Sequence, residues 1–356
     1  MNRERLSRVT ANMKREGLSC ILVSDPNSVY YLTGRMIWPG ERMLALEVRD
    51  SGEARLFCNR LFAQQAEEGL PLVEFDDTDD YVGLLAGMLP AGKVGIDKNW
   101  PSRFTIGLME KRADIRPVLG SLPVDDARML KGMDEREAMR ISSRLNDETT
   151  RRVIETLREG DTEREVGQRH VEIGKSLGAN GYSFQPLICF GKNGAEPHHG
   201  TDGTVLREGD TVILDVGLNV GGAMSDMTRT VVLGKATDEQ KEVYELVRAA
   251  NEAGKKAVAP GVPLREIDAA ARNVIAKAGY GDKFIHRTGH GIGMEVHEPP
   301  DVSSASPYVA QPGMIFSIEP GIYLPGKFGV RIEDLVLVTE DGCETLNRLP
   351  RDLIEL

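Results

Sequence analysis

Four acids and one histidine in the C-terminal half of the chain have the residue types and spacing of a metal site. Asp215 and Asp226 flank one predicted turn, and Glu319 and Glu333 flank another. Two carboxylates held close together repel each other unless a cation lies between them. Buried carboxylates need such compensation, which a pair of metal ions provides. His290, in a glycine-rich loop, is the fifth candidate ligand.

The first pair of acids is expected on a β-hairpin. Apolar, β-branched runs on both sides of residues 219–222 predict two strands, and the glycines between them predict the turn. If the turn is centred between Val220 and Gly221, Asp215 and Asp226 lie directly opposite each other on one face. Their Cβ atoms would then be about 4.5–5.5 Å apart.

The second pair of acids repeats this arrangement. Glu319 and Glu333 are equidistant from Gly326, in a predicted turn over residues 325–327. Strand patterns lie on both sides of this turn as well. We therefore expect a second hairpin whose two acids also face each other.

The two acid-bearing segments are similar in sequence. Residues 209–217 align with residues 313–321 without a gap, which places Asp215 on Glu319. Each copy is predicted to contain a helix, a glycine turn, a second helix and an acid-bearing hairpin. A duplicated unit that faces its twin would bring four carboxylates and His290 to one centre.

The other histidines differ in what they indicate. Glycines between His290 and His297 let the chain bend so that both reach one centre. His198 and His199 are adjacent, and their residue types alone do not decide between them. His170 lies on the apolar face of a predicted helix, so we expect it to be structural.

The N-terminal third has the pattern of a separate α/β domain. Leu6, Val9 and Met13 form a helical stripe, and short apolar strand patterns alternate with helical ones up to about residue 120. This predicts two domains, residues 1–122 and residues 123–356. The first contains no glycine loop of the kind that holds phosphate.

Bulk composition excludes several classes of function. The net charge is −11 and the pI about 5.2, which argues against a nucleic-acid partner. No apolar run approaches the ~18 residues of a membrane span. The four cysteines are scattered, and the charged first residues do not have the pattern of a signal peptide. We therefore expect a cytoplasmic protein with neither a nucleic-acid nor a membrane partner.

Several stretches together resemble the M24 metallopeptidase family, which has the pita-bread fold, in its prolidase and Xaa-Pro aminopeptidase branch. The matching stretches are residues 27–34, 214–217, 225–230, 286–293, 296–299, 317–321 and 330–334. The resemblance implies an α/β creatinase-like N-terminal domain, an α+β pita-bread catalytic domain of duplicated αββ units, and a homodimer.

The resemblance also implies which metal ion each of the five ligands would bind. Asp215 would bind one metal ion, Asp226 and Glu333 would bridge both, and His290 and Glu319 would hold the second. All five positions are filled in this sequence. Branches of the family that lack the metal set are therefore disfavoured.

Further roles follow from the same resemblance. His198 matches an active-site histidine, and His297 matches the one that contacts the substrate carbonyl. Arg331 matches an arginine that lies either behind the ligands or at the end of the substrate, and Phe184 matches part of a proline-ring pocket. Glu319 would also take the proton of the attacking water and pass it to the leaving nitrogen.

These inferences predict a di-metal exopeptidase of the Xaa-Pro dipeptidase (prolidase) type, acting on proline-containing di- or oligopeptides. Two ions about 3.5–4 Å apart would bridge a water and lower its pKa, and the resulting hydroxide would attack the scissile carbonyl. Mn²⁺ or Co²⁺ is expected first and Zn²⁺ or Fe²⁺ next, although this donor set suits all four. One alternative is an Xaa-Pro aminopeptidase acting on longer peptides. The other is a non-peptidase hydrolase of a small amide, or a non-catalytic binding protein.

Overall fold

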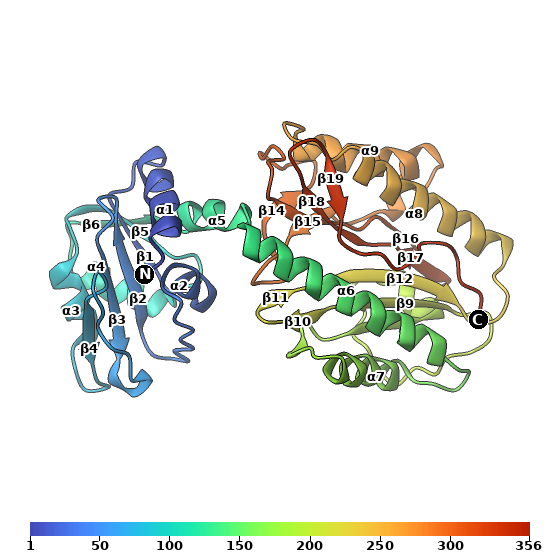
Figure 1. The fold of residues 1–356 in the computed structure, drawn as a ribbon, viewed down its shortest axis with the longest axis horizontal. Coiled ribbons are helices and arrows are strands. Elements are labelled where there is room, and N and C mark those ends of the chain that lie inside the picture. The colour runs from blue at the N-terminus through green and yellow to red at the C-terminus, as the bar shows by residue number, and fades with distance from the viewer. The chain divides into compact units, whose positions relative to one another are not determined.

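The computed structural model describes residues 1–356 and divides into two compact units, Met1–Arg128 and Met129–Leu356. Figure 1 labels the elements of each unit. α5 (Leu122–Met129) begins where the sequence predicted the second domain to start, and nearly all of it belongs to the first unit. None of the helices combines the length and apolar character that a membrane-spanning segment requires.

The first unit contains a six-stranded sheet in the order β4-β3-β2-β1-β5-β6. Its strands are β1 (Cys20–Val23), β2 (Leu44–Arg49), β3 (Ala54–Asn59), β4 (Leu72–Phe75), β5 (Gly92–Ile96) and β6 (Ile115–Leu119). Its other helices are α1 (Arg3–Arg15), α2 (Pro26–Thr33), η1 (Arg60–Phe62), α3 (Tyr81–Met88) and α4 (Ser102–Lys111). The predicted stripe Leu6, Val9 and Met13 is the buried face of α1.

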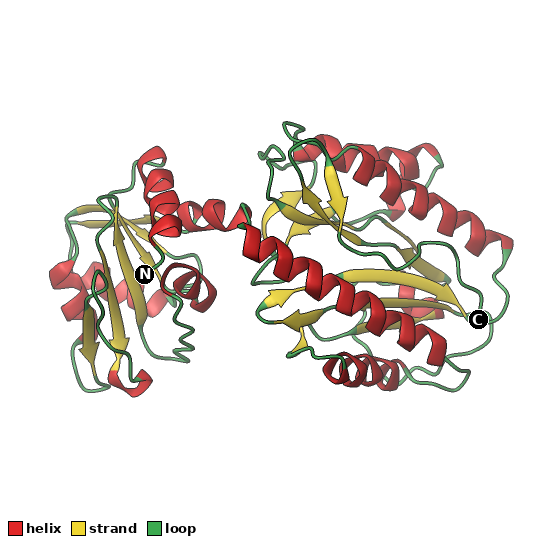
Figure 2. Ribbon diagram, viewed as in Figure 1, coloured by secondary structure: helices red, strands yellow, loops and turns green.

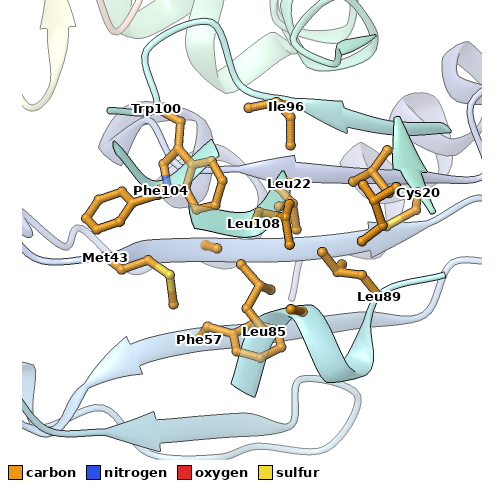
Figure 3. Packing of buried hydrophobic residues seen from close by; sticks show 14 of the residues in the cluster. Cys20, Leu22, Met43, Phe57, Leu85, Leu89, Ile96, Trp100, Phe104 and Leu108 are labelled. Carbon is orange, nitrogen blue, oxygen red and sulfur yellow. The ribbon is translucent and has the colours of Figure 1, made fainter. Parts of the chain in front are cut away.

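One core of this first unit lies between the sheet and the helices α3 and α4. Figure 3 shows Phe57 from β3 packed near Leu85 from α3, with Trp100 and Phe104 at the other end of the cluster. The cluster includes the aromatic side chains Phe57, Phe75, Trp100 and Phe104, and burial of such large apolar groups stabilises this α/β unit.

The second unit begins with a first repeat, residues 133–232. Its elements are α6 (Met133–Thr156), α7 (Glu163–Ser176), β7 (Gly181–Tyr182), β8 (Leu187–Phe190), η2 (Gly191–Ala195), β9 (Thr211–Val216), β10 (Leu218–Val220), β11 (Ala223–Met224) and β12 (Met227–Val232). They form two three-stranded sheets, β12-β9-β8 and β11-β10-β7.

The second repeat, residues 238–338, also has two helices followed by six strands, but its 3-10 helix precedes the first strand instead of following the second; β19 (Cys343–Thr345) comes after the repeat. Its elements are α8 (Asp238–Lys256), α9 (Leu264–Lys277), η3 (Gly281–Lys283), β13 (Gly289–Gly291), β14 (Glu298–Val302), β15 (Ile315–Ile318), β16 (Gly321–Leu324), β17 (Phe328–Arg331) and β18 (Asp334–Val338). In Figure 1, α8 and α9 lie together on one side of this unit's strands and α7 lies on the other, while Figure 2 shows the strands between the helices.

The predicted register of the first hairpin is wrong by two residues on the second strand. Thr228, not Asp226, lies opposite Asp215. The reason is the turn, which consists of Gly221 and Gly222, both with positive φ (61° and 88°). Two such glycines form the tight hairpin turn that matches strand twist, so the turn is centred one residue later than predicted. Asp226 remains on the same face as Asp215 because side chains alternate along a strand.

The predicted register of the second hairpin is confirmed. Ile318 pairs with Asp334 on one side of the acids, and Gly321 pairs with Arg331 on the other. Each hairpin nevertheless passes from one sheet to another at the acids, so neither is the continuous ladder that the sequence predicted. The acids therefore lie where strands change sheets.

The first helix of each repeat carries an asparagine that satisfies backbone carbonyls at these breaks. Asn146 of α6 donates to the Val216 carbonyl at 2.9 Å. Asn251 of α8 donates to the carbonyls of Ile318 and Ile332 at 2.8 and 3.4 Å. Buried carbonyls without a ladder partner need another donor, so these side chains hold the irregular backbone that carries the acids.

Candidate metal centre

Four of the five predicted ligands converge directly. One ligating atom from each of Asp226, His290 and Glu333 lies within 4.8 Å of the others. His290 Nε2 is also 3.6 Å from Asp226 Oδ2 and 3.4 Å from Glu319 Oε1. Asp215 is close enough that its charge raises the pKa of Asp226. The structure thus brings all five side chains together from both repeats.

These acids lie in an environment that opposes their ionisation. Burial first, and then the charges of neighbouring acids, raises the pKa values of Asp226 and Glu333 well above their ordinary range. Burial likewise raises the pKa of Glu319. Like-charged groups this close cannot all be ionised without a compensating cation.

The donor set fits divalent cations. Asp226 Oδ1 and Glu333 Oε1 are buried without a hydrogen-bond partner, as expected of oxygens that face a cation. Burial lowers the pKa of His290 to about 4, so its ring is neutral near pH 7. Nδ1 lies 3.1 Å from the Gly291 carbonyl, which can only accept, so Nδ1 carries the proton. The lone pair of Nε2 therefore faces the acids, as metal binding requires.

Arg331 lies behind this cluster. Its guanidinium donates to Asp215 Oδ2 at 2.5 Å, to the Tyr323 hydroxyl at 3.0 Å and to Thr228 Oγ1 at 3.2 Å. Thr228 Oγ1 in turn donates to Glu333 Oε2 at 2.8 Å. The Arg331 side chain is only 4 % exposed. These contacts place the arginine against an acid of the cluster rather than in an open cleft.

His297 and His198 lie beside the cluster. The rings of His290 and His297 meet edge to face, with centroids 4.3 Å apart. Burial, followed by the charges of neighbours that include His290 and His198, lowers the pKa of His297 to about 4. His198 is exposed, whereas His199 Nε2 lies 3.2 Å from Glu163 Oε2. Of these two adjacent histidines, His199 is thus engaged with Glu163, whereas His198 is close enough to His297 to affect its pKa.

The remaining sequence candidates occupy different places. Phe184 is half-buried, and its ring packs against Gly217, where a Cβ atom would come within 2.9 Å of it. Gly217 directly follows β9, the strand of Asp215, so the Phe184 ring lies beside the end of that strand. His170 is fully buried and pairs with Asn146 at 3.2 Å. It belongs to the packing of α7 against α6, as its apolar helical face predicted.

The sequence did not single out Thr228, Tyr323 or Ser317. Ser317 Oγ donates to Glu319 Oε1 and accepts from the His290 backbone N–H, each at 3.0 Å. Thr228 lies two residues after Asp226, and Ser317 lies two residues before Glu319. Strand periodicity from the ligands themselves could therefore have identified both. Tyr323 has no such signal.

Family comparisons agree with this geometry. A family model described as Metallopeptidase family M24 matches residues 137–340, and one described as Creatinase/Prolidase N-terminal domain matches residues 5–130. The chain belongs to metallopeptidase family M24. Membership implies divalent metal ions, for which the cluster supplies the ligands. The predicted family is confirmed.

Relatives match over the full length of the chain. A probable dipeptidase PepE from Mycobacterium bovis is 36 % identical, covering 98 % of this chain and 95 % of the relative. An Xaa-Pro dipeptidase from Pyrococcus furiosus is 33 % identical, covering 99 % and 100 %. A recombinant prolidase from Thermococcus sibiricus, whose crystal structure is known, is 36 % identical in sequence. Its structure matches with a TM-score of 0.93, and the match covers 100 % of both chains. The predicted fold class, a creatinase-like domain followed by a pita-bread catalytic domain, is confirmed.

Proposed function

We propose that this metallopeptidase is an Xaa-Pro dipeptidase of the prolidase type, which hydrolyses the peptide bond before proline. The observation that carries the proposal is the convergence of four acids and one neutral imidazole on a buried centre with orphaned carboxylate oxygens. Full-length relatives named Xaa-Pro dipeptidase support the substrate class. An Xaa-Pro aminopeptidase acting on longer peptides would use the same centre.

Five side chains would hold two divalent ions, with Mn²⁺ or Co²⁺ expected before Zn²⁺ or Fe²⁺. These ligands are Asp215, Asp226, His290, Glu319 and Glu333. When bound, the ions supply Lewis acidity and lower the pKa of a water towards neutrality. Arg331 and Thr228 fix the carboxylates of Asp215 and Glu333 in orientation through the hydrogen bonds described above.

Three side chains would carry out proton transfer and stabilise the oxyanion. Glu319, whose pKa is raised by burial, accepts the proton of the attacking water and delivers it to the leaving imino nitrogen. His297 is neutral near pH 7 and donates a hydrogen bond to the carbonyl oxygen of the scissile bond as charge develops there. His198, from the segment between β8 and β9, donates a hydrogen bond to the same carbonyl oxygen.

We propose that an apolar surface recognises the proline ring of the substrate. A proline nitrogen in a peptide bond has no N–H, so its site needs a ring-shaped apolar surface rather than an acceptor. Phe184 provides such a surface beside the strand of Asp215. Of the two roles that the sequence left open for Arg331, its buried contacts support the one behind the ligands.

We further propose a cytoplasmic homodimer with neither nucleic-acid nor membrane partners. The family resemblance supports the dimer, and a net charge of −11 supports the absence of a nucleic-acid partner. The four cysteines are free, three of them buried, which is typical of a reducing compartment. Light scattering of the purified chain would show whether it is a dimer.

A substrate panel tests the proposed activity. The protein, loaded with Mn²⁺ or Co²⁺, is given Xaa-Pro dipeptides, the matching Xaa-Pro-Yaa tripeptides and non-proline dipeptides. We expect the Xaa-Pro dipeptides to have the highest kcat/KM. Faster cleavage of the tripeptides would instead support the aminopeptidase, and no cleavage of any Xaa-Pro bond would contradict both.

A further inference from the structure

A second group of acidic and histidine side chains lies outside the metal centre, at the start of α7. One ligating atom from each of Glu163, His199 and Asp202 lies within 4.8 Å of the others. Glu163 is the first residue of the helix, and its side chain is completely buried. A buried carboxylate at such a place requires a specific set of partners.

The partners of Glu163 are hydrogen-bond donors. Oε1 accepts from the Phe190 backbone N–H at 2.8 Å and from Asn193 Nδ2 at 2.9 Å. Oε2 accepts from the Asp202 backbone N–H at 3.0 Å and lies 3.2 Å from His199 Nε2. Because a carboxylate can only accept, His199 Nε2 carries a proton. Four donors thus use the lone pairs of both oxygens, which indicates a polar clamp rather than a metal site.

All four donors belong to one segment, residues 190–202, which contains His198. Phe190 and Asn193 hold its beginning, and Asp202 and His199 hold its end. Backbone contacts strengthen the second attachment, since the Glu163 N–H donates to the Thr204 carbonyl at 3.1 Å. The start of α7 therefore closes the segment into a loop with both ends fixed.

We propose that Glu163 is a positioning residue, which holds this loop so that His198 faces the metal centre beside His297. This inference rests on the proposed function, in which His198 donates to the scissile carbonyl. His198 is itself exposed, so its position depends on how its loop is held, and Glu163 fixes both ends of that loop. Misplacing such a donor by about 1 Å is enough to cost up to about a hundredfold in rate.

The test begins with Glu163→Gln, which keeps the size of the side chain but replaces one accepting oxygen with a donating NH₂ group. The amide cannot accept from both Phe190 and Asp202, so one end of the loop loses its anchor. We expect faster hydrogen exchange of the amides in residues 190–204, unchanged metal content, and a fall in kcat of about 10- to 100-fold with a smaller change in KM.

Asp161→Asn is the matched control. Asp161 pairs with Arg169 at 2.8 Å near the same end of α7, and the hydrogen bonds and ion pairs of its side chain are to Arg158 and Arg169 rather than to the 190–202 loop. This variant should change stability at that end of the helix while leaving the exchange of residues 190–204 and kcat unchanged. Equal kinetic defects in the two variants would overturn the proposal.

A double-mutant cycle with His198→Ala separates positioning from general destabilisation. If Glu163 acts through His198, Glu163→Gln should add little loss of kcat to that of His198→Ala. Additive losses, unchanged exchange in the loop, or a third metal ion per chain that disappears in Glu163→Gln would each overturn the inference. Faster loop exchange combined with full activity of His198→Ala would support the clamp and contradict the catalytic role proposed for His198.

Discussion

The two repeats share one plan but contribute different groups to the centre. Cys189 of β8 lies opposite Ile213, while His290 of β13 lies beside Ser317, the residue that aligns with Ile213. The two side chains thus occupy equivalent strand positions. Burial raises the pKa of Cys189 to about 12, which keeps it a neutral thiol. Both repeats therefore place carboxylates at the centre, but only the second places an imidazole nitrogen there.

The helices behind the two strand breaks differ in a similar way. In the first repeat, His170 of α7 donates to Asn146, which supports the break near Asp215. Residues 160–166 of the first repeat align with residues 261–267 of the second, which places Ala271 on His170. In the second repeat, Asn251 contacts two carbonyls instead of one. The comparison shows that an asparagine supports the acid-bearing backbone in both repeats, whereas each histidine occurs in only one of them.

The largest effects are expected from the bridging acids, one from each repeat. Asp226→Asn and Glu333→Gln should each lose far more activity than the about 10–100-fold typical of residues that only support ligands. A neutral amide is a poor bridging ligand, so both variants should fail alike in a kcat assay at saturating metal. A severe loss in only one of them would show that the repeats do not contribute equally.

The equivalent positions His290 and Cys189 should respond differently. His290→Ala removes a nitrogen ligand and should raise the metal concentration needed for half-maximal activity by at least about tenfold. Cys189→Ala should leave that concentration unchanged and cost only about 1 kcal/mol of stability, as is usual for a small loss in a core. Metal titration of activity measures the first effect and urea unfolding the second. A similar rise for both variants would contradict the assignment of a nitrogen ligand to one repeat.

His297→Ala should separate catalysis from metal binding within the second repeat. Loss of one oxyanion donor typically costs about 10²–10³-fold in kcat. The metal content should stay at the wild-type value, because His297 contacts the ring of His290 and is not one of the five proposed ligands. Elemental analysis and steady-state kinetics on the same preparation measure both quantities. A fall in metal content equal to that of His290→Ala would reassign His297 as a ligand.

The smallest effect on chemistry is expected at His170, in the first repeat. Burial lowers its pKa from 6.5 to about 3, so between these values the unfolded chain binds a proton that the folded chain does not. Stability is then present above pH 6.5 and is lost as the pH falls towards 3, by up to about 1.4 kcal/mol per pH unit.

His170→Gln keeps a donor for Asn146 but does not titrate, so its stability should fall less steeply over this range than that of the wild type. Urea unfolding between pH 6.5 and 4 measures the difference, and the carboxylates common to both proteins cancel. Parallel curves, or a large loss of kcat at pH 7.5, would contradict the structural role of His170.

The sequence was sufficient to predict that the five proposed ligand side chains converge, because the patterns behind that prediction act over short distances. Alternation along strands and the gap-free alignment of Asp215 with Glu319 predicted the shared centre and the register of the second hairpin. The first register failed because two consecutive glycines, Gly221 and Gly222, moved the turn by one residue. The alternation of apolar residues along the strands does not reveal such a shift, because both acids stay on one face wherever the turn is centred, one residue earlier or later.

Other features depend on partners far away in the sequence. The sequence did not single out Glu163, and the role proposed for it depends on donors at Phe190 and Asp202. Arg331 could have faced substrate or ligands, and its contact with Asp215 crosses between the repeats. Such contacts depend on how the two repeats pack, which local patterns do not encode.

The most direct test of the central claim is the number of metal ions per chain. Elemental analysis of fully active, metal-saturated protein should give two divalent ions per chain. The same measurement on Asp226→Asn and Glu333→Gln should give fewer than two in each case, because one bridging acid comes from each repeat. At most one ion per chain in the fully active protein would contradict a di-metal centre built by the two repeats together.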